Sequence, residues 1–372
     1  MTYRPAKGER GRFVENYPVP MTMAVPLAPR RTGDALEAWA REYRNELKWQ
    51  LRNGPAAMAF HDLAPRLMNL ERGGAVAFHD ALQAFDREGD LNSLILWAED
   101  GYAVRAVHGG WEPPASQPAE SLESILSRPK RPGQLRDSFS AILFKRPEAA
   151  EWLREWSLHV ADRSDVSTFA NGVTARGAHG YGGLHQRVYD DGAYFDAPPN
   201  GFIPTPNVPV PWSRPQYEQY SAMPTLALML RPEFAFFQPD MSADRLAELL
   251  EGALGKVLGT PALRTRPPTR IFYSAPADVS RPALLARSLA RVAPQAGLMN
   301  ASTAFGLEQC LGGDLGAASM NAGLALGAIA VWESAEPALV VNLRDPGGAV
   351  VCGLWPVADD YRKTLNPRPY VI

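Results

Sequence analysis

Two thiols and a small set of histidines are the side chains of this sequence that could carry nucleophilic chemistry. Cys310 lies in "LEQCLGG" and Cys352 in the apolar run "AVVCGLW", and the last of the six histidines is His185. A cysteine reacts as its thiolate, which a helix N-terminus or a neighbouring cation must stabilise. Cys352 has the surroundings of a structural thiol, which leaves Cys310 as the candidate nucleophile. Two cysteines without a CxxC motif favour a reducing compartment, although a single bridge stays possible.

The histidine–aspartate pairs do not have the spacing of a metal site. "AFHD" occurs twice, and in the second copy His79 and Asp80 lie on a predicted helix without a partner histidine or glutamate in zinc spacing. The chain has no HExxH motif and no GxSxG elbow of an esterase. We therefore predict no catalytic residue, no metal site and no cofactor.

A glycine-rich segment, "LGGDLGAASMNAGLALGAIAVW", covers residues 311–332. It lacks both the GK[ST] of a phosphate loop and the full GxGxxG spacing, and Asp314 would repel a phosphate. The pattern instead predicts a tight turn that leads into a helix, with Asp314 as the helix N-cap. The residues assigned to this structural turn are Gly312, Gly313, Asp314 and Gly316.

The uncharged run that follows, residues 315–332, is long enough to raise the question of a membrane span. Alanine and glycine dominate this run, and the transfer of such small side chains into lipid is only weakly favourable. We therefore expect a helix buried inside the protein. The whole chain of 372 residues has a net charge of −2 and 46% hydrophobic residues, with a mean hydropathy of −0.22. These values are typical of a globular protein without attraction to nucleic acid or anionic lipid. No apolar signal segment follows the basic start, so we expect a cytoplasmic protein.

A helix, a strand and a hairpin occur in the same order in both halves of the chain. Placing Ala81-Leu82 over Ala325-Leu326 sets the apolar "LIL" of residues 94–96 against "ALV" of residues 338–340. The turns "EDG" and "RDPGG" then lead into "YAVRAV" and "AVVCGLW", the predicted second strands of the two hairpins. The pattern predicts an internal duplication.

This duplicated unit resembles the thiolase and β-ketoacyl-synthase superfamily, on "GDLGAASMNAGLALGAIAVW" and its counterpart "ERGGAVAFHDALQAFDREGDLNSLILWAEDG". The resemblance implies a layered α/β fold of two pseudo-symmetric halves with buried helices of small residues. It also implies a nucleophilic cysteine around residues 73–75 and histidines in the second half, and this chain has neither. We therefore expect a pseudoenzyme on a degenerate thiolase-like fold.

A longer resemblance points to the lipase-adaptor family of bacterial type VI secretion. It rests on the order of "RFVENYPVPMTMAVPL", "LILWAEDGYAVRA", "RDSFSAILFKRPEAAEWLREW", "PVPWSRPQYEQYSAMPTLALMLRPEF" and "GGDLGAAS". It implies a non-enzymatic adaptor or chaperone that binds a phospholipase effector and helps to load it onto the secretion spike protein. Two alternatives stay open, namely an acyl-transfer enzyme that uses Cys310 and a module that binds an acyl ligand.

The middle of the chain combines turn-forming residues with many aromatic side chains. Residues 168–220 are rich in Gly, Pro and Asn, and a flexible linker would lack such aromatics. We predict either a partner interface or an ordered crossover there, with these residues as the leading partner-binding candidates: Tyr194, Phe195, Phe202 and Trp212. The predicted organisation is an arm (1–19), a first half (20–165), the crossover (166–215) and a second half (216–372).

Overall fold

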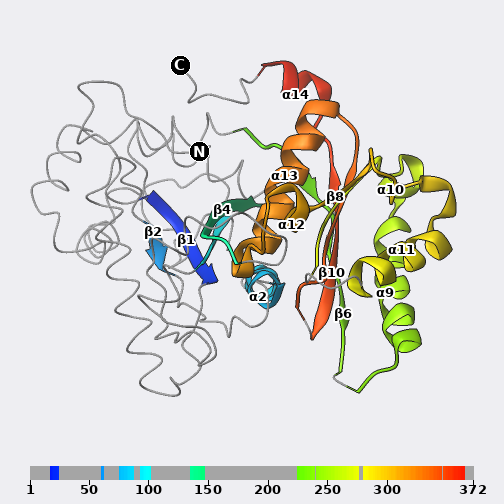
Figure 1. Cartoon of the computed structure of the whole chain (residues 1–372). Helices are drawn as coiled ribbons and strands as arrows, with labels where there is room; N and C mark the ends of the chain where they lie inside the picture. Colours follow the sequence, from blue (N-terminus) through cyan, green and yellow to red (C-terminus); the bar gives the residue numbers. More distant parts are fainter. Residues whose placement is uncertain are drawn as a thin grey trace, which may run out of the picture.

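The strands of the computed structural model form two sheets with helices between them and on the outer face of the second sheet (Figure 1). The structure describes residues 17–24, 60–62, 75–87, 93–101, 135–146, 224–238, 240–275, 280–345 and 347–364. The prediction of an α/β protein is confirmed by this alternation of sheets and helices.

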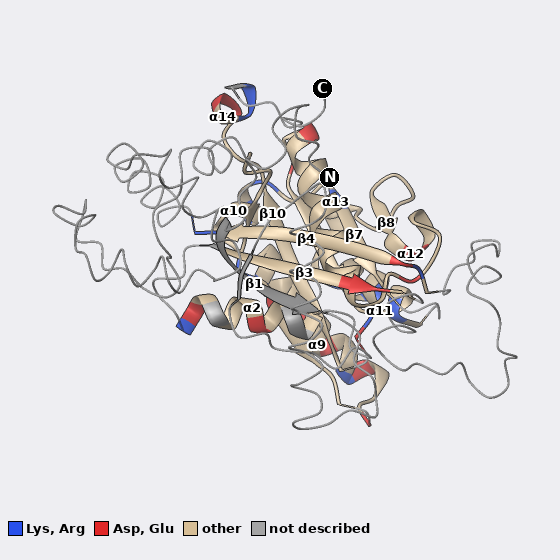
Figure 2. Cartoon of the chain, turned by 90° about the vertical axis from the view of Figure 1, so that its left-hand side faces the viewer, with Lys and Arg blue, Asp and Glu red and all other residues tan. Residues whose placement is uncertain are grey.

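The first sheet has the strand order β2-β1-β3-β4. Its strands are β1 (Tyr17–Ala24), β2 (Phe60–Asp62), β3 (Ser93–Asp100) and β4 (Ser138–Lys145). β1 runs parallel to both β2 and β3, whereas β4 runs antiparallel to β3. β1, β3 and β4 face the viewer in Figure 2.

The second sheet has the path β5-β10-β9-β7-β8, and β6 also pairs with β10. Its strands are β5 (Leu228–Met229), β6 (Glu233–Phe236), β7 (Arg270–Ser274), β8 (Ala304–Gly306), β9 (Ala338–Asn342) and β10 (Gly348–Trp355). β7 runs parallel to β8 and β9, whereas β10 is antiparallel to β9, β5 and β6. Both predicted strands of the second hairpin, "ALVVNL" and "AVVCGLW", are therefore present.

The layer between the sheets contains α2 (Ala75–Arg87) and α13 (Ser319–Ser334), with the short α12 (Leu307–Cys310) and a 3-10 turn, η4 (Gly316–Ala318), ahead of α13. Small residues let α13 approach the second sheet closely. A Cβ on Gly327 would lie 2.8 Å from Leu354 and 3.0 Å from Val340. On its other side, Asn321 donates to the backbone oxygen of Leu96 in β3 at 2.9 Å.

The uncharged segment is thus a helix buried between two sheets, as the sequence predicted. Its side chains Met320, Leu324 and Val331 share one apolar cluster with residues of both sheets. No helix in the described ranges has both the length and the hydropathy needed to cross a bilayer.

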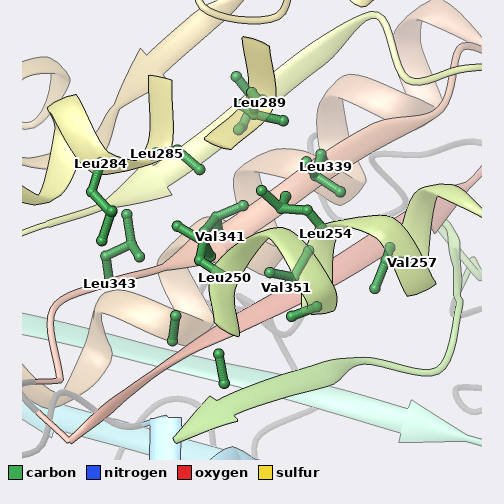
Figure 3. Close-up of a cluster of buried hydrophobic side chains, with 14 of the residues drawn as sticks. Leu250, Leu254, Val257, Leu284, Leu285, Leu289, Leu339, Val341, Leu343 and Val351 are labelled. Carbon is green, nitrogen blue, oxygen red and sulfur yellow. The ribbon is translucent and has the colours of Figure 1, made fainter. Parts of the chain in front are cut away.

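The outer face of the second sheet is covered by α9 (Ala243–Leu258), α10 (Pro261–Thr265) and α11 (Ser280–Val292) (Figure 1). β9 is buried along its whole length because its side chains alternate between the two layers. Val340 points to the middle layer, whereas Leu339 and Val341 pack under α9 and α11 (Figure 3). A last helix, α14 (Asp359–Thr364), follows β10.

The two sheets repeat one topology. β3 and β9 hold the same place in their sheets, since each pairs with a parallel strand on one side and an antiparallel strand on the other. The alignment of residue 94 with residue 338 also places the first residue of α2 on the first residue of α13. The predicted duplication is confirmed at this level, whereas the exact boundaries of the halves involve residues outside the described ranges and stay predictions.

One predicted pairing is wrong. The sequence favoured "YAVRAV" as the hairpin partner of "SLILWA", but β4 takes that place and pairs with β3 along its full length, from Asp100 opposite Ser138 to Ser93 opposite Lys145. The strand that pairs with the end of β3 therefore begins 38 positions later in the sequence, at Ser138 opposite Asp100. Turn residues after a strand show where a hairpin could form, but not which apolar segment returns to the sheet.

Candidate functional site

A shallow pocket with a volume of about 160 Å³ opens at the start of α2. The first helical residue, Ala75, and His79 form one wall, and the β6–β10 pair forms the other. The remaining lining residues are Phe234, Ala235, Phe236, Asp345, Gly347, Gly348, Ala349 and Val350. The pocket therefore brings a helix of the first half against a strand pair of the second half.

Aromatic rings make the accessible wall of this pocket. The ring of His79 meets that of Phe234 edge to face, with centroids 4.7 Å apart, and Phe234 stacks on Phe236 with centroids 6.3 Å apart. Phe236 is 65% exposed, the largest exposed fraction among the large apolar side chains that the structure describes. Such a half-open aromatic surface is suited to contact with an apolar group.

The pocket lies at the start of α2, where the thiolase resemblance implies a nucleophilic cysteine around residues 73–75. Ala75 occupies the helix start, and both cysteines lie elsewhere. Cys310 is an exposed residue at the end of α12. Cys352 is fully buried in β10, and burial raises the pKa of its thiol far above the ordinary value. The Cys352 thiol is therefore held in its unreactive form.

The turn before α13 is built around Asp314, though not as a helix N-cap. The N-cap position of α13 is Ala318, which has no side-chain cap bond. Asp314 instead accepts from the backbone N–H of Gly316 at 2.8 Å, and Arg344 donates to both of its carboxylate oxygens at 2.6 and 2.7 Å. The prediction of an N-cap is wrong because a 3-10 turn intervenes between this residue and the helix.

Two glycines of the same turn have left-handed backbone conformations, Gly312 with φ of +74° and Gly316 with φ of +56°. A Cβ on Gly316 would lie 1.9 Å from a carboxylate oxygen of Asp100, the last residue of β3. Glycine is required there by both the backbone angle and the space. Gly313 is not among the glycines with a positive φ.

Segments of the first sheet hold this turn from the opposite side. Asp100 accepts from the backbone N–H of Ala317 at 2.8 Å, and the Ser138 hydroxyl donates to the oxygen of Leu315 at 2.7 Å. Arg136 donates to the oxygen of Gly312 at 2.9 Å. The entrance to α13 is therefore built by both halves of the fold.

A second carboxyl lies buried near this turn. Glu308 of α12 is 6% exposed and accepts from the Ser274 hydroxyl and from the backbone N–H of Ala275. Burial raises the pKa of Glu308, and these hydrogen bonds only partly oppose the effect. For the neighbouring Arg344, burial acts to lower the pKa, but the hydrogen bonds and charge of Asp314 outweigh it and the pKa is raised. The cluster holds α12, α13 and the strand ends together.

The four predicted partner-binding aromatics lie outside the described residues: Tyr194, Phe195, Phe202 and Trp212. Of the described residues, sequence reasoning missed the aromatic pair Phe234 and Phe236. The alternation in "EFAF" could have indicated an edge strand with one aromatic face. The contact of Phe234 with His79, however, depends on the tertiary structure.

Comparison with known families supports one of the two resemblances directly. Residues 226–356 match the family model described as type VI lipase adapter protein Tla3, C-terminal. The matched range begins just before β5 and ends just after β10, so it contains the whole second sheet. The predicted similarity to the lipase-adapter family is confirmed for these residues.

The chain is also similar to solved structures of ketosynthases and thiolases. One is the ishigamide ketosynthase/chain length factor, with 13% identity, coverage of 91% of this chain and 74% of that chain, and a TM-score of 0.43. Another is human mitochondrial 3-ketoacyl-CoA thiolase, with 13% identity, coverage of 94% and 89%, and a TM-score of 0.40. A third is the peroxisomal 3-ketoacyl-CoA thiolase of Saccharomyces cerevisiae, with 14% identity, coverage of 92% and 85%, and a TM-score of 0.41.

Proposed function

We propose that this protein is a cytoplasmic, non-enzymatic adaptor that binds a phospholipase effector and helps to load it onto the spike of a type VI secretion system. The observation that carries the proposal is the match of residues 226–356 to the C-terminal part of a type VI lipase adapter. The matched range contains a full sheet with helices on both faces.

The positions of the two thiols favour an adaptor over an acyl-transfer enzyme. Thiolate catalysis needs a cysteine whose pKa is lowered by a helix N-terminus or a nearby cation. Cys310 lies at the C-terminal end of the four-residue helix α12, not at a helix N-terminus. Cys352 is buried and its pKa is raised. Neither cysteine lies at a helix N-terminus, the position that would stabilise its thiolate.

The proposed effector interface includes aromatic side chains of residues 166–215, which connect the two proposed halves. Rigid aromatic side chains bury a large area at a small entropic cost, so a few of them can dominate an interface. Tyr194, Phe195, Phe202 and Trp212 are the proposed anchors. An ordered crossover that packs on its own core is the competing role for the same residues.

Co-purification tests the proposal. The full chain is produced together with the lipase encoded beside its gene, and the mixture is separated by size-exclusion chromatography. We expect the two proteins to elute as one complex, and the purified chain alone to release no product from phospholipid or acyl-coenzyme A. Separate elution at micromolar concentrations would contradict the adaptor function. A covalent acyl adduct on Cys310, detected by mass spectrometry, would favour the acyl-transfer alternative.

A further inference from the structure

The outer edge of β6, on the side away from β10, combines two features that a partner strand could use. Within the described ranges, β6 pairs with β10 and with no other strand. Phe237 donates its backbone N–H to Gly347 at 2.7 Å, toward β10. Backbone groups of successive residues in an antiparallel ladder point to opposite edges. The N–H and C=O groups of Phe236 and Phe234 therefore point away from β10, along the outer edge.

The residues with outward backbone groups also form the wall of the pocket. Phe234 packs on Phe78 and His79 of α2, and Phe236 stacks on Phe234 above the pocket opening. The intervening Ala235 faces the opposite layer, under α9. A strand added to this edge would place alternate side chains on the face of these two rings, next to the pocket.

The pocket offers a partner a mostly apolar and aromatic surface. Its lining contains one carboxylate, that of the buried Asp345, and no lysine or arginine. Two basic side chains beside β6 form ion pairs within the fold, Arg231 with Asp86 at 2.6 Å and Lys256 with Glu233 at 3.1 Å. An apolar side chain of the partner therefore fits this lining better than a charged one, because burying an unpaired charge is costly.

We propose that the outer edge of β6 binds an extended segment of the lipase effector, which adds a strand to the second sheet and places an apolar side chain against Phe236 at the pocket. Main-chain hydrogen bonds to Phe234 and Phe236 would supply affinity, and the pocket would supply side-chain selectivity. The inference rests on the proposed adaptor function and adds a contact surface to the one proposed for residues 166–215. All of the β6 residues lie within the range that matches the adapter family.

Two variants of one residue separate the backbone contribution from the side-chain contribution. Phe236→Ala removes the exposed ring, and Phe236→Pro removes the ring together with the outward N–H while every hydrogen bond to β10 is kept. Phe139→Ala is the matched control, since Phe139 is a 57% exposed aromatic residue on β4 of the other sheet. Affinity for the purified lipase encoded beside this chain is measured by titration calorimetry, with the melting temperature of each variant as a folding check.

We expect Phe236→Ala to weaken lipase binding about tenfold, Phe236→Pro to weaken it by roughly another tenfold, and Phe139→Ala to bind like the unaltered chain. Hydrogen exchange of the peptide that contains residues 234–236 should slow when the lipase is added. If the unaltered chain binds the lipase while both Phe236 variants bind equally well and exchange is unchanged, the β6 inference is wrong and the adaptor function stands. If the unaltered chain does not bind the lipase, both are wrong.

Discussion

The Asp100 carboxylate, at the end of β3, accepts a hydrogen bond from the backbone N–H of Ala317 at 2.8 Å, although the two residues are 217 positions apart in the sequence. The other carboxylate oxygen accepts from the backbone N–H of Gly101. Asp100 is fully buried. One side chain of the first sheet thus satisfies a free backbone donor at the entrance to the buried helix of the second half.

Removing this acceptor should destabilise the protein. In Asp100→Ala the N–H of Ala317 stays buried without its partner, which costs about 1–3 kcal/mol of the free energy of unfolding. Asp100→Asn keeps one carbonyl acceptor and should lose less. Urea denaturation of both variants measures the difference, and equal stability of Asp100→Ala and the unaltered chain would show that this contact contributes nothing.

Two glycine-to-alanine substitutions should have opposite effects. Gly316→Ala puts a Cβ on a residue with φ of +56° and against Asp100, so we expect a loss of about 1–2 kcal/mol from the backbone conformation alone. Gly252 lies exposed in the interior of α9, and a Cβ added to it would have no neighbouring atom within 4 Å. Gly252→Ala should stabilise the protein by about 0.5–1 kcal/mol. Thermal melts measure the change in stability of each variant. If both variants were stabilised, or both destabilised, the conformational argument would be contradicted.

Stability should decrease as pH rises because of Glu308. Its pKa is raised in the folded state, so the folded chain binds the proton more tightly than the unfolded chain does. The contribution of the protonated form to stability is complete below the unfolded pKa of about 4.3 and is lost as pH rises through the folded pKa. Glu308→Gln keeps the shape of the side chain and removes its titration. From about pH 4 upward, the Tm of the unaltered chain should therefore fall progressively relative to the Tm of Glu308→Gln. A constant difference would exclude the effect.

The cysteines should be dispensable for function. Cys352→Ala removes a buried sulfur and should cost on the order of 1 kcal/mol in stability, whereas the exposed Cys310→Ala should melt like the unaltered chain. Both variants should bind the lipase with unchanged affinity. Loss of lipase delivery in a folded Cys310→Ala variant would reveal chemistry at this thiol.

Alanine variants of Tyr194, Phe195, Phe202 and Trp212 distinguish an interface from a structural crossover. If the residue anchors the interface, its alanine variant should lose about 2 kcal/mol of binding free energy, roughly thirtyfold in affinity, with an unchanged Tm. A residue that packs on its own core should lower the Tm while the folded protein binds normally. Affinity and melting temperature are therefore measured together for each variant, and the second result at all four positions would place the interface elsewhere.

Local patterns were sufficient for the elements that bury continuous apolar runs. The helix over residues 319–334, the strands over residues 338–342 and 348–355 and the duplication of the unit around them all follow from the spacing of apolar and small residues. Those features depend on side chains that are near one another along the chain, and periodicity reports them directly.

Pairing between distant segments was not accessible in this way. Three contacts join segments that are far apart in the sequence and that local patterns cannot relate. They are the pairing of β4, rather than "YAVRAV", with β3, the ion pair of Asp314 with Arg344, and the contact of Phe234 with His79. Many apolar segments could complete the same sheet edge, and the tertiary structure selects one by the sum of its packing against the rest of the chain. The sequence by itself therefore determined the kinds of elements and their repetition. Only the tertiary structure decided which residues meet at the turn before α13 and at the pocket beside β6.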